Sequence, residues 1–185
     1  MTSFALVGRE RELELLLGGL AALATGRGSL FFLTGEPGIG KTRLADELAA
    51  HAVRAGATVA WGAAWDGGGA PAYWPWIEVV RALRPLVPEP DETLRRDLGP
   101  LWGEPAEAVR APAPGDPDPQ DPELRGFRRF DALRAVLQAA AQRTRLLVIL
   151  EDLHAADRGS LLALQLVARA LRSLPVLILG THREA

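Results

Sequence analysis

The chain contains one octapeptide in which glycine, lysine and threonine stand at fixed spacings: Gly35-Glu36-Pro37-Gly38-Ile39-Gly40-Lys41-Thr42. It fits the pattern G-x-x-x-x-G-K-[ST] without a mismatch and lies between an apolar run at 29–34 and a helical pattern at 41–55. Glycines let the backbone curl so that successive N–H groups point inward at a phosphate, and the helix that follows adds partial positive charge. We therefore expect a buried strand, a phosphate-binding loop and a helix in direct succession.

The lysine of this loop is unusual in its context. Lys41 is the only lysine among 21 basic residues, and the others are arginines. A compact ammonium on a flexible stem differs from a planar guanidinium, so a lone lysine indicates a position that arginine does not serve. We expect Lys41 to reach the β- and γ-phosphates of a nucleotide and the Thr42 hydroxyl to bind Mg²⁺. The predicted nucleotide-binding residues here are Gly35, Glu36, Pro37, Gly38, Ile39, Gly40, Lys41, Thr42 and Arg43. The alternative is a glycine turn without a ligand.

Apolar patterning predicts helices and strands in alternation. Periodicity predicts helices at 9–24, 41–55, 75–86, 123–143 and 159–172, and apolar runs predict strands at 29–34, 58–61, 146–150 and 175–180. This alternation is typical of an α/β fold with helices on both faces of a mostly parallel sheet.

Length and composition narrow the class of protein. The 185 residues suit one domain, and 48% apolar with 24% charged residues is typical of a globular chain. Cysteine is absent, and no apolar run approaches the ~20 residues that span a bilayer. A net charge of −2 gives no electrostatic basis for direct nucleic acid binding. We expect a cytoplasmic domain, 1–185, that contacts neither membrane nor nucleic acid.

A proline-rich acidic insertion interrupts this domain at 85–122. It holds ten prolines, nine acidic residues and three arginines. The sequence 112–122 can form neither a helix nor a central strand, because six of its residues at close spacing are proline or glycine. We expect an extended, mobile surface segment, with a partner-binding role as the alternative.

Two acids follow the third predicted strand. Glu151 and Asp152 come directly after the apolar run 146–150, as in a Walker B sequence. Ligands of open α/β sheets bind at the carboxyl ends of parallel strands, where these acids would lie. We expect Glu151 to hold Mg²⁺ through water together with Thr42, and Asp152 to polarise the attacking water. Arg183, beyond the last strand, is either a sensor of the γ-phosphate or a surface arginine, and His154 either positions water or caps the strand end.

Aromatic residues gather between the second strand and the next helix. Trp61, Trp65, Tyr73, Trp74 and Trp76 lie within sixteen residues that contain no lysine or arginine. Core packing is the first interpretation, and a surface for a ligand or partner is the second.

Five segments together resemble a known family: 6–10, 35–42, 67–76, 151–157 and 180–183. They look like the N-terminal ATPase domain of large ATP-binding transcriptional regulators, many of which end in a LuxR-type DNA-binding domain. Those proteins belong to the signal-transduction NTPases (STAND) of the AAA-like branch. One departure is Glu151, which stands where aspartate is more usual.

The resemblance implies a P-loop NTPase fold, a three-layer sandwich with strand order 2-3-4-1. It implies that Val7, Gly8 and Arg9 fold over the adenine, that Arg183 is the sensor arginine, and that ATP and ADP switch the domain between states. It also implies a further strand, a helical lid, a winged helix and sensor regions as partners beyond residue 185. Without that strand the edge at 30–33 would favour self-association.

We therefore expect slow, Mg-dependent ATP hydrolysis catalysed by Lys41, Glu151, Asp152 and Arg183. A module that binds ATP or ADP without hydrolysis is the alternative, and a small-molecule kinase is a more distant one.

Overall fold

A computed structural model describes residues 8–65, 67, 70–103 and 122–184. Its strands are β1 (Ser29–Thr34), β2 (Thr58–Ala63), β3 (Leu146–Glu151) and β4 (Val176–His182). Its α-helices are α1 (Glu10–Ala22), α2 (Lys41–Arg54), α3 (Trp74–Leu83), α4 (Glu92–Leu98), α5 (Pro122–Ala141) and α6 (Arg158–Ala170). Short 3-10 helices are η1 (Leu23–Thr25), η2 (Arg84–Leu86), η3 (Gly99–Trp102) and η5 (Leu153–Ala155).

The four strands form one sheet in the order β1-β4-β3-β2, and every neighbouring pair is parallel. This confirms the predicted order 2-3-4-1. Because all strands run the same way, the loops that leave their carboxyl ends lie along one edge of the sheet. β4 stands between β1 and β3, and Leu179 pairs with Phe31 on one side and Ile149 on the other.

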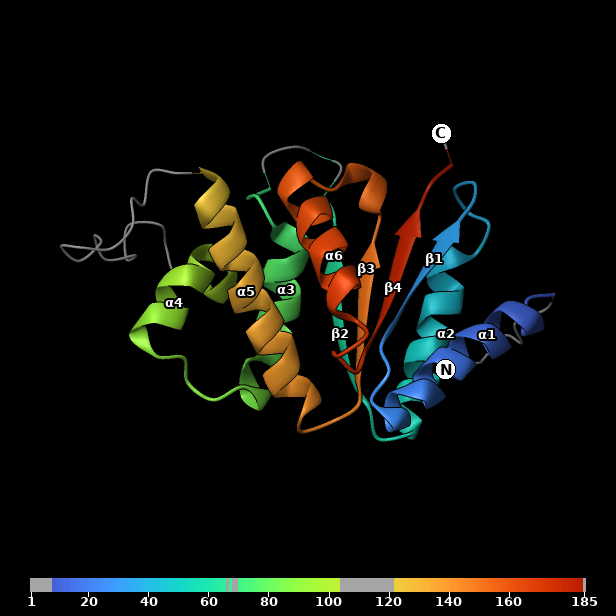
Figure 1. Ribbon diagram of the computed structural model, residues 1–185. Coiled ribbons are helices and arrows are strands. Elements are labelled where there is room, and N and C mark those ends of the chain that lie inside the picture. Colours follow the sequence, from blue (N-terminus) through green and yellow to red (C-terminus); the bar gives the residue numbers. More distant parts are fainter. Residues whose placement is uncertain (1–7, 66, 68–69, 104–121, 185) are drawn as a thin grey trace.

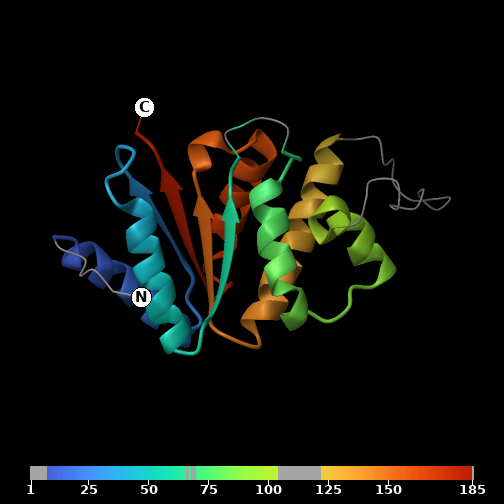
Figure 2. The same ribbon diagram turned by 180° about the vertical axis from the view of Figure 1, so that it is seen from behind.

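Helices cover both faces of the sheet, which confirms the three-layer α/β fold (Figures 1 and 2). On one face, α1 and α2 pack against Leu147 and Ile149 of β3. On the other face, α3, α5 and α6 pack against Leu146, Val148 and Leu150 of the same strand. β3 is thus buried on both sides, as its continuous apolar sequence predicts.

Predicted and observed elements agree closely, with small differences at their ends. β4 extends two residues beyond the predicted strand and so includes Thr181 and His182. β2 likewise extends to Ala63, two residues beyond the strand predicted at 58–61. Within the described ranges, no helix is both long and apolar enough to cross a membrane.

The first part of the insertion at 85–122 is folded, whereas the extended segment predicted at 112–122 lies, except for Pro122, outside the described residues. Residues 92–102 form α4 and η3, which bury Leu98, Leu101 and Trp102 against the α3–α5 side of the core. The reason is local: residues 91–99 contain no proline, and the Asp91 carboxylate caps α4 by accepting the Leu94 N–H at 2.7 Å. Residues 104–121 lie outside the described part of the chain.

Among the described residues, β1 is an edge strand of the sheet and pairs with β4 alone. Its Phe32 is 51% exposed, whereas Phe31 packs into the core under α1 and α2. Self-association through this edge stays a prediction.

Two adjacent glycines of α1 allow a matched test of how this helix packs on the sheet. A Cβ at Gly18 would meet nothing within 4 Å, whereas one at Gly19 would lie 2.6 Å from Phe31 Cε2 and 3.2 Å from Leu177 Cδ1. We expect Gly18→Ala to raise the free energy of unfolding by about 0.5–1 kcal/mol, through helix propensity. We expect Gly19→Ala to lower it by about 1–3 kcal/mol, through overpacking. Urea denaturation of both variants measures this, and equal effects would contradict the packing described here.

Candidate functional site

The loop between β1 and α2 takes backbone conformations that favour glycine. The φ angles of Gly35, Gly38 and Gly40 are 143°, 78° and 97°. A Cβ at Gly38 or Gly40 would meet nothing within 4 Å, so conformation, rather than lack of space, calls for glycine there. Gly40 is the residue before α2, and its carbonyl accepts the Leu44 N–H at 3.0 Å. The loop therefore ends by presenting the N-terminus of a 14-residue helix.

Lys41, the first residue of α2, is held within this loop. Its side chain is buried, with 8% of the residue exposed. Its Nζ donates hydrogen bonds to Gly35 O at 2.7 Å and Glu36 O at 2.9 Å. An ammonium has three N–H donors, so these two bonds fix its position and leave a third donor for an anionic oxygen.

Thr42 joins the loop to the end of β3. Its Oγ1 donates a hydrogen bond to Glu151 Oε1 at 2.8 Å, across 109 residues of sequence. A hydroxyl and a carboxylate oxygen are hard donors of the kind that Mg²⁺ prefers beside substrate phosphates. These two residues therefore fit a magnesium ion, and their role in binding one stays a prediction.

Asp152 is held in a strained main-chain conformation beside Glu151. Its φ is 54°, and its N–H donates to Thr181 Oγ1 at 2.9 Å. Thr181 lies in β4 and is 2% exposed. The hydroxyl of β4 thus holds the main chain of the predicted catalytic acid. Sequence analysis did not single out Thr181, although a hydroxyl residue after an apolar strand beside β3 was a usable signal.

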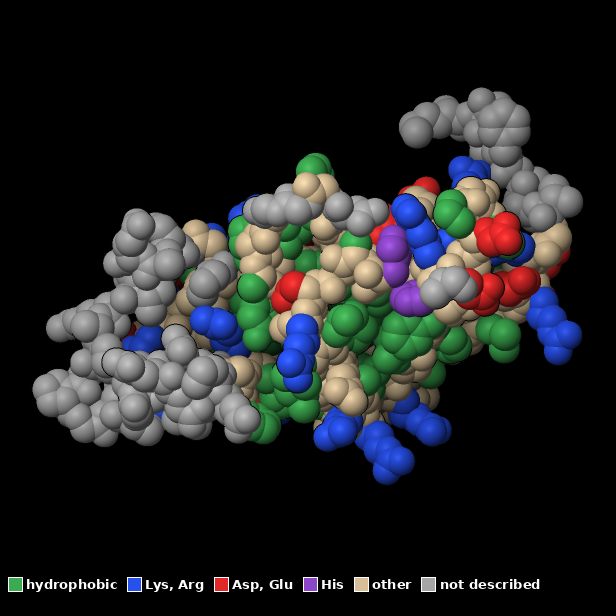
Figure 3. All heavy atoms as spheres, turned by 90° about the horizontal axis from the view of Figure 1, so that it is seen from above, with side chains coloured by type: hydrophobic (Ala, Val, Ile, Leu, Met, Phe, Trp, Pro, Cys, Tyr) green, Lys and Arg blue, Asp and Glu red, His purple; other side chains and the backbone are tan. Residues whose placement is uncertain are grey.

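Two histidines lie beside this acid. His154 Nδ1 is 3.9 Å from Asp152 Oδ1, and the His154 and His182 rings meet edge to face with centroids 6.2 Å apart. Figure 3 looks onto the carboxyl ends of the strands and shows histidine, basic and acidic side chains together on this face. His154 is therefore placed toward the site, in η5, and both of its predicted roles stay open.

A family model described as "AAA ATPase domain" matches residues 5–179, nearly the whole chain. The chain belongs to the AAA ATPase domain family.

Other comparisons add little to this assignment. No curated protein matches this chain. Among solved structures it is similar to a chain in "Structure of Drosophila ORC bound to GC-rich DNA and Cdc6", with 12% identity and a TM-score of 0.41. That match covers 100% of this chain and 54% of the other, so the AAA ATPase domain spans about half the length of that relative.

The residues predicted to fold over adenine are described in part. Gly8 and Arg9 lie at the start of α1, and Val7 lies outside the described residues. The Gly8 N–H donates to Glu10 Oε1 at 3.1 Å, and hydrogen bonds from the Glu10 and Gly8 main chain lower the pKa of the Glu10 carboxyl. This carboxylate fixes the chain entering α1, and a role at adenine stays a prediction.

Two of the three predicted arginines, Arg43 and Arg183, lie at the surface. Arg183 follows β4 directly and is exposed at the same sheet edge as Glu151 and Asp152. Arg43 is exposed on the first turn of α2, one residue after Thr42. Their roles in the AAA ATPase domain stay predictions.

Asp157 connects the segment after β3 to the aromatic segment before α3. Its carboxylate accepts the Tyr73 N–H at 3.0 Å and the Ser160 N–H at 3.0 Å, and the Ser160 hydroxyl at 2.5 Å. Trp76 Nε1 donates to Ser160 O at 3.0 Å nearby. Sequence analysis missed Asp157, because only the folded chain brings residues 73 and 157 together.

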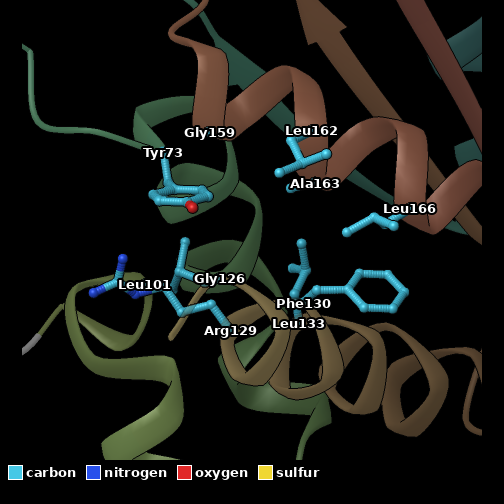
Figure 4. Close-up of a pocket in the computed structure, with 10 residues that line it drawn as sticks. All are labelled: Tyr73, Leu101, Gly126, Arg129, Phe130, Leu133, Gly159, Leu162, Ala163 and Leu166. Atoms are coloured by element: carbon cyan, nitrogen blue, oxygen red, sulfur yellow. The ribbon is translucent and has the colours of Figure 1, made fainter. Parts of the chain in front are cut away.

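The aromatic residues divide between core and surface. Trp76 is fully buried, which agrees with the core-packing interpretation, whereas Trp65 is 61% exposed. Tyr73 lies over a narrow gap between α5 and α6, where the Arg129 guanidinium is 5.5 Å from its ring centroid (Figure 4). This gap has a volume of about 10 Å³, room for one water at most, so it is a packing seam.

Removal of the Thr181 hydroxyl tests how firmly β4 holds Asp152. We expect Thr181→Val to lower the free energy of unfolding by about 1–2 kcal/mol, because the Asp152 N–H loses its partner while side-chain shape is kept. The matched control is Thr58→Val in β2, whose hydroxyl makes only a 3.4 Å contact with Thr144 Oγ1, and we expect a change below about 0.5 kcal/mol. Urea denaturation compares the two, and equal losses would contradict the assigned role of Thr181.

Proposed function

We propose that this AAA ATPase domain binds Mg-ATP and ADP at the loop Gly35–Thr42 and hydrolyses ATP slowly, as a molecular switch. The observation that carries the proposal is the hydrogen bond from Thr42 Oγ1 to Glu151 Oε1 at 2.8 Å. It joins the phosphate-binding loop to the acidic end of β3, where metal and phosphate have to meet. Membership of the AAA ATPase domain family supports the same activity.

Each residue then has a definite task. The backbone N–H groups of the glycine loop and the N-terminus of α2 bind phosphate oxygens. Lys41 donates its third N–H to the β- and γ-phosphates, and on binding its other two N–H groups turn from the carbonyls of Gly35 and Glu36 to the same phosphates. Asp152 accepts a hydrogen bond from the attacking water and orients it in line with the γ-phosphate. Mg²⁺, when bound beside Thr42 and Glu151, neutralises charge that develops on the phosphate oxygens.

The side-chain length of Glu151 is the reason to expect slow ATP turnover. Glu151 is one methylene longer than the aspartate usual at this position, so its carboxylate has more rotational freedom to lose on binding. We infer a switch in which the bound nucleotide, more than its rate of hydrolysis, sets the state of the protein. The resemblance described above supports a role for such a switch in a signal-responsive transcriptional regulator, where a lid, a winged helix and sensor regions would respond to it.

Nucleotide binding is tested by thermal shift with Mg-ATP, ADP and GTP. At 100 times the dissociation constant a ligand adds about 2.7 kcal/mol to the folded state, or roughly 5–10 °C for a domain of this size. We expect this rise with adenine nucleotides, and its loss in both Lys41→Ala and Lys41→Arg, because a guanidinium is too wide for the loop. Arg172→Ala is the control and should keep the full rise, because Arg172 precedes β4 and so lies near the amino-terminal ends of the strands.

Two outcomes would argue against this site. One is an unchanged rise in Lys41→Ala, and the other is the absence of any rise in a wild-type sample shown to be folded by circular dichroism.

Hydrolysis is tested by single-turnover measurement on the Asp152→Asn variant. We expect ATP binding to be kept and the rate to fall by about a hundredfold or more, because an amide no longer polarises the water. Asp131→Asn, an exposed substitution on α5, is the matched control and should turn over like the wild type. Full turnover in Asp152→Asn would refute the assignment, and a wild type that binds ATP without cleaving it would identify a non-hydrolysing module.

A further inference from the structure

The carboxylate of Asp152 is held less firmly than its main chain. The N–H of this residue donates to Thr181 Oγ1 at 2.9 Å. The Asp152 side chain is 46% exposed and, in the part of the chain that the structure describes, it makes no capping hydrogen bond at the start of η5. A group that orients an attacking water has to keep its accepting oxygen in one direction. The site therefore calls for a further residue that positions this carboxylate.

His154 stands where such a residue is needed. Its Nδ1 is 3.9 Å from Asp152 Oδ1, and among the described residues it is the basic side chain nearest to that carboxylate. The His154 side chain is only 21% exposed. The Ala155 N–H donates to Asp152 O at 2.8 Å, so a tight turn fixes residues 152 and 154 relative to each other. The 3.9 Å contact is longer than a hydrogen bond, as catalytic contacts often are before the substrate binds.

His182, the last residue of β4, supports the His154 ring. The two rings meet edge to face, with centroids 6.2 Å apart and an angle of 88° between their planes, an arrangement that aromatic rings favour. His182 pairs with Thr34, the residue before the phosphate-binding loop. The sheet thus fixes the main chain of His182, and its ring limits the rotation of the imidazole beside Asp152 (Figure 3).

We propose that His154 is a positioning residue for ATP hydrolysis, which holds the carboxylate of Asp152 while His182 supports its ring. The Nδ1–H of His154 donates to Asp152 Oδ1, and Oδ2 is left to accept the hydrogen bond of the attacking water. The imidazole keeps its proton and acts through Asp152, without contact to the nucleotide. This role rests on the proposed function, because it requires that Asp152 orients the water.

Single-turnover hydrolysis of Mg-ATP by His154→Leu and His154→Asn, measured on the whole chain, tests this role. We expect His154→Leu to slow the reaction about tenfold at unchanged ATP affinity, because the carboxylate is left free to rotate. His154→Asn should recover most of the rate, since its Nδ2–H stands where the Nδ1–H of histidine stood. A histidine that only caps the end of β3 would change the melting temperature and leave the rate alone.

The matched control is His51→Leu on α2, which removes a surface histidine paired with Glu47 at 3.6 Å and should turn over like the wild type. Circular dichroism and thermal melting verify that each variant folds. Two outcomes would overturn the role of His154: a wild-type rate in His154→Leu, or an equal loss of rate in His154→Leu and His154→Asn.

A double-mutant cycle shows whether His154 acts through Asp152. In the Asp152→Asn background we expect His154→Leu to change the rate less than about twofold, because the carboxylate that it positions is already gone. A further tenfold loss in that background would contradict the proposal, since His154 would then act on the reaction independently.

The support from His182 is tested with two substitutions that differ in their ring. We expect His182→Leu to slow hydrolysis about threefold and His182→Phe, which keeps an aromatic ring against His154, to stay close to the wild-type rate. Equal rates in the two variants would refute the part assigned to His182.

Failure of this role is distinguishable from failure of the proposed function. A wild type that binds ATP without cleaving it, or full turnover in Asp152→Asn, would overturn the proposed function and the role of His154 with it. Normal hydrolysis by the wild type and slow hydrolysis by Asp152→Asn, together with a wild-type rate in His154→Leu, would overturn the role of His154 alone.

Discussion

The parallel pairing of β4 with both β1 and β3 is the constraint on which the site depends. It sets the predicted phosphate-binding loop and the acids two strands apart, at a separation that Thr42 and Glu151 close with one hydrogen bond. β4 also acts chemically, because Thr181 holds Asp152 in a conformation with positive φ. Gly180 keeps this region compact, since a Cβ there would lie 2.6 Å from Leu153 Cδ1 and 2.9 Å from Phe32. β4 thus separates β1 from β3, hydrogen-bonds the main chain of Asp152, and packs closely against Leu153 and Phe32.

The elements that local sequence determines were predictable. Continuous apolar runs located the four strands, and the glycine spacing located the loop, because both patterns reflect short-range requirements of backbone and burial. The strand order came from family resemblance, and the structure confirms it. Helix α4 was missed because the prolines around it hid a proline-free stretch with its own aspartate cap.

Features that depend on contacts between distant segments were not predictable from the residues alone. Thr181 acts on Asp152 across neighbouring strands, and Asp157 binds Tyr73 across 84 residues of sequence. The aromatic segment shows the same limit. Composition indicated a cluster of indoles, but only the fold separates Trp76 in the core from Trp65 at the surface. Sequence therefore supplied the candidates, and tertiary structure sorted them.

Asp157 gives the domain a mechanical property. Its carboxylate ties the segment after β3 to the residue before α3, and Trp76 ties the first turn of α3 to α6. A Cβ at Gly159 would lie 2.7 Å from the Tyr73 ring, so the two segments are also in close contact. These contacts fix the two segments to one another, so a displacement of η5 and the start of α6 would carry the first turn of α3, and Trp74 with it.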